Sequence, residues 1–158
     1  MTKQYVQALL TGLKEKQRVL CTLQEKTDQQ TCLLQTEGMD WDAFDALVDE
    51  KDALIDELDK LDDGFTVTFE RIREELQEKK AEYKAQIAAM QEMIRTVTEQ
   101  STALQAAEYR NHELVKQKIA GERRSIRQQK TGSKAAANYY AAMNRLNFID
   151  PQLMDKKK

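Results

Sequence analysis

The chain has few of the residues that make turns, thick cores or catalytic sites. Its 158 residues include one proline, five glycines and one histidine, and only 6% are aromatic. A sandwich, a barrel or a doubly wound sheet needs a turn about every 8–12 residues, which this composition does not supply. There is also no glycine-rich phosphate loop, and one histidine gives little scope for a metal site. We therefore expect neither a β-rich fold nor an enzyme, and no cofactor or metal.

Charged and helix-favouring residues dominate what is present. Charged residues make up 33% of the chain and hydrophobic residues 41%, with a mean hydropathy of −0.74. This is too apolar for a disordered chain and too polar for a thick core. No apolar run approaches the roughly 18 residues that a membrane helix needs, and the first residues carry no secretory signal. The composition predicts an all-α cytoplasmic protein with thin helical layers.

The two cysteines lie eleven positions apart, at Cys21 and Cys32, in a predicted helix. That spacing puts them on one face but roughly 16 Å apart. A disulfide needs Cα atoms within roughly 7 Å, so no bond within the chain is expected. We interpret both as small, reduced core or boundary residues.

The first predicted helix covers about residues 2–35 and repeats every seven residues, which is typical of a coiled coil. Lys16, Gln17 and Gln30 interrupt its apolar pattern. The residues that carry the repeat are Val6, Leu13, Leu20, Thr27 and Leu34.

A second helix is predicted to start at Trp41 with Asp40 as its N-cap. Trp41 and Phe44 are expected to plug the end of the core. Residues 37–63 contain twelve Asp or Glu against two Lys. Because these carboxylates follow a helical face rather than a calcium-binding loop, we expect a solvated face, or one that meets a basic third helix. The aspartates concerned are Asp45, Asp49, Asp52, Asp56 and Asp59.

The end of this helix is ambiguous in the sequence. Residues 62–64 resemble a turn and favour a break at Gly64. The apolar spacing nevertheless continues through Gly64 in phase, so a continuous helix is the alternative. An unbroken third helix over residues 66–129 would be about 95 Å long against about 50 Å for the first. Either it projects beyond the bundle or a turn lies near residues 77–80. The whole predicts an elongated antiparallel three-helix bundle over residues 2–130.

The last quarter of the chain changes character. Residues 110–134 hold eight Lys or Arg against two Glu, and residues 131–158 form an apolar, aromatic tail with a short helix expected at about 134–144. The basic residues are most simply a solubilising helix end, with phosphate binding as the weaker alternative. His112, surrounded by charge, is expected at the surface or boundary.

Three segments give the chain a resemblance to a known family. Residues 49–55 (DEKDALI) and 110–114 (RNHEL) lie in the second and third helices, and residues 136–155 (AANYY through DPQLMD) lie in the tail. With these segments the chain resembles the FlgN family of flagellar export chaperones, in its clostridial branch. The resemblance implies a cytoplasmic helical protein that guards hook–filament junction proteins before secretion.

The resemblance also implies the binding sites. An amphipathic terminal helix of the client would lie on the late third helix, and a C-terminal tyrosine, Tyr139 or Tyr140, would contact the cytoplasmic domain of the export gate. Two other classes stay open: a coiled-coil scaffold or dimerisation module, and a nucleic-acid accessory protein using residues 123–134. The implied client contacts are Leu104, Tyr109, Val115, Ile119 and Ile126.

Overall fold

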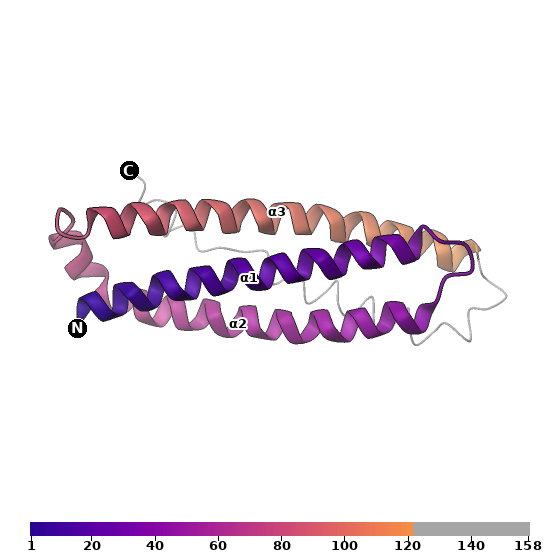
Figure 1. The fold of residues 1–158 in the computed structure, drawn as a ribbon, viewed down its shortest axis with the longest axis horizontal. Coiled ribbons are helices and arrows are strands. Elements are labelled where there is room, and N and C mark those ends of the chain that lie inside the picture. The colour runs from indigo at the N-terminus through magenta and orange to yellow at the C-terminus, as the bar shows by residue number, and fades with distance from the viewer. Residues whose placement is uncertain (122–158) are drawn as a thin grey trace.

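The computed structural model describes residues 1–121, which form three long helices in up–down–up order (Figure 1). These are α1 (Thr2–Leu34), α2 (Trp41–Glu78) and α3 (Lys84–Gly121). No strand occurs in this part of the chain. The predicted all-α three-helix bundle is therefore confirmed. The tail at 131–158 and its expected helix at 134–144 lie outside the described residues.

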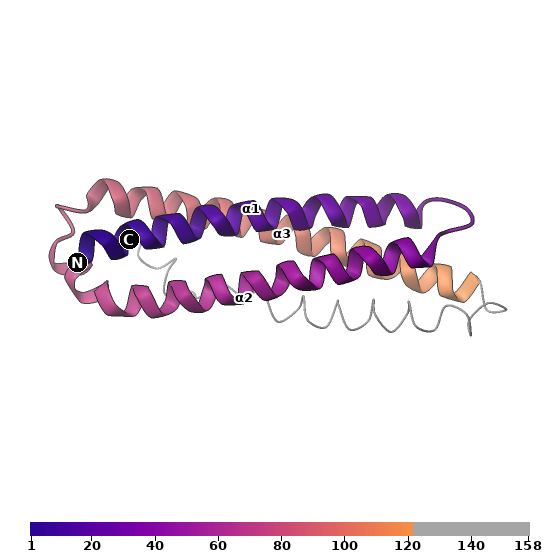
Figure 2. The same ribbon diagram turned by 60° about the horizontal axis from the view of Figure 1, so that its bottom comes forward.

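The three helices are not equivalent in their packing. Helix α1 packs along both α2 and α3, whereas the backbones of α2 and α3 approach each other at very few points. Figure 1 shows α1 lying between the other two helices over most of its length, and Figure 2 shows the same bundle turned by 60°. Helix α1 is therefore the central element, and the side between α2 and α3 is the least closed by backbone packing.

The connection between α1 and α2 follows its sequence signals. Gly38 adopts the left-handed conformation, with φ of 66°, which a residue with a Cβ rarely adopts. The carboxylate of Asp40 accepts a hydrogen bond from the backbone N–H of Ala43 at 3.1 Å and caps α2. Trp41 and Phe44 are both buried, with their rings edge to face and 5.6 Å between centroids. The predicted cap and the predicted core plug are both confirmed.

The break favoured at Gly64 is wrong, because α2 continues through this residue to Glu78. A helical glycine costs about 1 kcal/mol relative to alanine. The apolar residues on either side hold the helix in phase, and the rings of Phe65 and Phe69 stack with centroids 6.2 Å apart. The chain turns instead at residues 79–83, the alternative suggested by helix length. Residues 66–78 thus belong to α2, and the third helix starts at Lys84 rather than at residue 66.

The core consists of two apolar clusters arranged along the bundle axis. One lies toward the 79–83 turn and the other toward the 35–40 connection. The first contains Val6, Leu9, Leu13, Phe69, Ile72, Leu76, Tyr83, Met90 and Ile94. The second contains Val19, Leu20, Leu23, Leu34, Met39, Trp41, Phe44, Val48, Ile55, Leu58, Val97, Leu104 and Val115.

Candidate functional site

Four of the five implied client contacts lie in α3, and they do not share one exposed side. Leu104 and Val115 are core residues, 0% and 4% exposed, and Ile119 packs against the same cluster. Tyr109 is 67% exposed. A partner could contact Tyr109 directly, but it could reach Leu104 or Val115 only if the helices separated. The remaining implied contacts, Ile126, Tyr139 and Tyr140, lie outside the described residues.

A layer of polar side chains crosses the core between the three helices. Lys51 of α2 is completely buried and forms an ion pair with Glu108 of α3, itself 4% exposed. The Lys51 ammonium also donates a hydrogen bond to Gln30 Oε1 of α1 at 2.6 Å. All three helices therefore contribute to one buried charge-containing layer.

Threonines and an asparagine extend this layer along α1 and α3. The Thr27 hydroxyl lies 2.8 Å from Glu108 Oε1. The Asn111 side chain donates to the backbone carbonyl of Thr27 at 3.1 Å and accepts from the Thr31 hydroxyl at 2.7 Å. Because Asn111 is fully buried, each of these bonds offsets part of its desolvation. We call Thr27, Gln30, Lys51, Glu108 and Asn111 the buried polar layer.

The buried polar layer is electrostatically strained at Lys51. Burial lowers the pKa of Lys51 to about 8, against the opposing effect of the Glu108 carboxylate. The lowered pKa means that keeping Lys51 charged in the folded state costs free energy. The charged form of Lys51 therefore depends on its ion pair with Glu108. Breaking such a pair by removing one partner typically costs about 3–5 kcal/mol.

A second polar contact separates the two apolar clusters. Lys16 of α1, 9% exposed, pairs with Asp62 of α2 at 2.5 Å. Leu13 belongs to the cluster on one side of Lys16 and Val19 to the cluster on the other. The core is therefore interrupted by charge at two levels.

In the sequence alone, Lys16 and Gln30 interrupt the apolar repeat of the first helix. Lys16 and Gln30 are instead core residues of α1. The signal was present in the spacing, since Lys51 lies three residues after Val48 and four before Ile55. Alternating steps of three and four mark core-facing positions whatever residue occupies them.

Seven aspartates follow α2 at alternating steps of three and four. The ion pairs of α2 with the other helices use different residues, such as Glu50 and Glu57 toward α1. Among the described residues, none of the seven aspartates forms an ion pair, and no group of three metal-ligating side chains occurs. We call these residues, Asp42, Asp45, Asp49, Asp52, Asp56, Asp59 and Asp63, the aspartate stripe.

Like charge accumulates along the aspartate stripe. The pKa of Asp45 is raised, first by partial burial and then by the neighbouring carboxylates of Asp49 and Asp42. The pKa of Asp52 is raised by partial burial and then by Asp49 and Asp56. The repulsion means that a cationic partner on this face would be favoured electrostatically.

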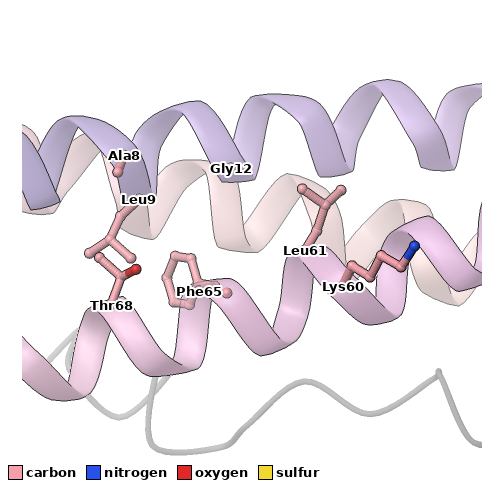
Figure 3. Close-up of a pocket in the computed structure, with 8 residues that line it drawn as sticks. Ala8, Leu9, Gly12, Lys60, Leu61, Phe65 and Thr68 are labelled. Atoms are coloured by element: carbon pink, nitrogen blue, oxygen red, sulfur yellow. The ribbon is translucent and has the colours of Figure 1, made fainter.

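A shallow hollow of about 210 Å³ lies between α1 and α2 (Figure 3). Each helix contributes a glycine to its lining, Gly12 from α1 and Gly64 from α2. A Cβ added at Gly12 or Gly64 would meet no atom within 4 Å. The hollow thus comes from two missing side chains. Its lining residues are Ala8, Leu9, Gly12, Lys60, Leu61, Gly64, Phe65 and Thr68.

Two remaining expectations concern single residues. His112, in α3, is partly exposed and lies at the boundary between core and surface, as expected. The interpretation of Cys21 and Cys32 as core or boundary residues is wrong, because both thiols are free and exposed on α1. They lie outside the three–four spacing of the core positions, on the outer face of the helix.

Within residues 1–121, no helix combines the length and the apolar character needed to cross a membrane. Comparison with known proteins finds no matching family model, no matching curated protein and no matching solved structure.

Proposed function

We propose that this protein is a cytoplasmic flagellar export chaperone that binds terminal amphipathic helices of hook–filament junction proteins. The proposal rests on the resemblance of residues 49–55 and 110–114 to the FlgN family. Lys51 and Asn111, one from each segment, lie in the same buried polar layer. This gives both segments a structural role, which is to hold α2 and α3 in register on α1.

The observation that carries the proposal is the unequal packing of the three helices. Helix α1 packs along both others, while α2 and α3 scarcely approach each other along their backbones. An amphipathic client helix could pack against this side of the bundle, with the exposed ring of Tyr109 as its contact on α3. The client must become ordered on binding, which lowers the net affinity and keeps the complex dissociable for export. Delivery would use the export gate, with Tyr139 or Tyr140 as the contact.

The test uses the exposed member of the implied client site. We expect Tyr109→Ala to weaken binding of a junction protein's C-terminal segment about tenfold, the usual scale for an aromatic anchor. Cys21→Ala is the control, because Cys21 is also exposed but lies on the outer face of α1. Val115→Ala is unsuitable, since it would open a cavity in the core. Equal binding by the Tyr109→Ala variant and wild type would refute the client site.

Two further measurements separate the chaperone from its alternatives. A chaperone of this kind is expected to sediment as a monomer that binds one client, whereas a scaffold or dimerisation module would be an obligate oligomer. Deleting residues 133–158 should spare client binding and weaken binding to the export gate. The reverse result would place the client contact in the tail.

A further inference from the structure

The aspartate stripe lies on the flank of α2 that is turned away from α1. Glu50 and Glu57, which pair with α1, each come one residue before a core position. The stripe residues Asp49, Asp52 and Asp56 each come one residue after a core position. One residue is about 100° around a helix, so the two sets occupy opposite flanks of the core-facing line. The cations of α1 therefore cannot neutralise the stripe.

The segment that follows Gly121 starts near the beginning of the aspartate stripe and could pair with it. Helix α3 is described as far as Gly121, and the Lys118 ammonium donates to the backbone carbonyl of Thr36 at 3.1 Å, in the α1–α2 connection. The end of α3 and the start of α2 therefore share one end of the bundle (Figures 1 and 2). A segment leaving Gly121 and turning back would run parallel to α2 and pass the stripe from Asp42 onward.

The spacing of the basic residues after Gly121 matches that of the stripe. Arg123, Arg127, Lys130 and Lys134 follow one another at steps of four, three and four. Asp45, Asp49, Asp52 and Asp56 follow one another at the same steps in the same direction. In helical form each set spans about 17 Å, so two parallel helices would place four opposite charges side by side.

From these observations we propose that residues 123–134 dock as a helix, parallel to α2, on the aspartate stripe of their own chain. Arg123 pairs with Asp45, Arg127 with Asp49, Lys130 with Asp52 and Lys134 with Asp56. The self-docked segment relieves the repulsion within the stripe and covers the flank of α2 that α1 leaves open. This proposal does not depend on an export role, because it concerns contacts within one chain.

Disulfide trapping in the full-length protein tests the proposal. In a Cys21→Ser, Cys32→Ser background, Asp49→Cys and Arg127→Cys should form a bond within one chain under mild oxidation. The matched control keeps native Cys21, which is exposed on α1, and carries Arg127→Cys and Cys32→Ser. No bond between Cys21 and the new cysteine is expected. A disulfide-linked dimer would show that a second copy occupies the stripe, and equal trapping of pair and control would show no specific docking. Either result overturns the proposal.

Charge reversal adds a measurement that does not depend on cysteine geometry alone. In the trapping variant, Arg123→Glu, Lys130→Glu and Lys134→Glu together should reduce the rate of trapping about tenfold, as three weak pairs are lost. Adding Asp45→Lys, Asp52→Lys and Asp56→Lys should restore it, with far-UV circular dichroism confirming that the helices persist. Unchanged trapping in the first variant, or no recovery in the second, would refute the proposed register.

Discussion

Replacing Glu108 by glutamine removes the carboxylate that faces Lys51 while keeping nearly the same side-chain volume. In the wild type the Lys51 ammonium is fully buried and bonded to both Glu108 and Gln30. The Glu108→Gln variant removes the ion pair between that ammonium and Glu108. We expect the free energy of unfolding near pH 6 to fall by up to about 3 kcal/mol, because at that pH a Lys51 with a pKa of about 8 can release its proton at this cost.

The pH dependence distinguishes this cause from simple loss of packing. Burial lowers the pKa of Lys51 from the ordinary value of 10.5 to about 8. Between pH 8 and 10.5 the unfolded chain binds more protons at this residue than the folded chain, so wild-type stability rises with pH there, by about 3 kcal/mol from Lys51. Without Glu108 the pKa of Lys51 falls further, so the cost of Glu108→Gln should shrink by more than half between pH 6 and pH 9.

Urea unfolding followed by circular dichroism at 222 nm measures both effects across this pH range. Glu50→Gln is the matched control, because it breaks an exposed pair with Lys26 at 2.7 Å and should cost at most about 1 kcal/mol. The Lys51→Met variant should lack the rise in stability above pH 8. If Glu108→Gln destabilises no more than Glu50→Gln, or with no dependence on pH, the reasoning about the buried ion pair fails.

Three other predictions test the helices and the surface of α1. Gly64→Ala should raise the free energy of unfolding by about 1 kcal/mol, because a Cβ there meets no atom within 4 Å, and a loss of stability would contradict the continuous α2. Gly38→Ala, at φ of 66°, is the opposite control and should lower it by about 1 kcal/mol. Asp40→Ala should also lower it, by about 1 kcal/mol through loss of the cap, and an unchanged urea midpoint would argue against that bond. Both Cys21 and Cys32 should react with a thiol reagent in the native protein, and a thiol labelled only in denaturant would contradict their exposure.

The helices could be predicted because local signals and apolar periodicity agree over most of the chain. The Asp40 cap and the Trp41–Phe44 plug follow from residue type and position. The continuity of α2 through Gly64 could not be read from residue type, because the turn signal and the apolar phase compete there. Packing on α1 decides between them, and a propensity scale does not contain that packing.

The positions of the implied client contacts were harder to predict, because the spacing of apolar residues does not say whether they face the core or a partner. Apolar residues at Leu104 and Val115 suit either a binding surface or a core. The structure uses them in the core, since α1 is long enough to cover α3 along most of its length. The polar layer was missed for the same reason, because the polar character of Lys51 and Glu108 hides their core-facing spacing.

The buried polar layer also favours one register over others. If α2 slid by one heptad, Lys51 would face apolar neighbours and Glu108 would lose its counter-charge, so misregistered and swapped bundles are penalised strongly. Replacing both residues, as Lys51→Met with Glu108→Leu, removes this penalty without leaving a lone charge. We expect that double variant to be as stable as wild type or more stable, yet to sediment as a mixture of oligomeric states. A single species like the wild type, with stability unchanged, would mean that apolar packing alone fixes the register.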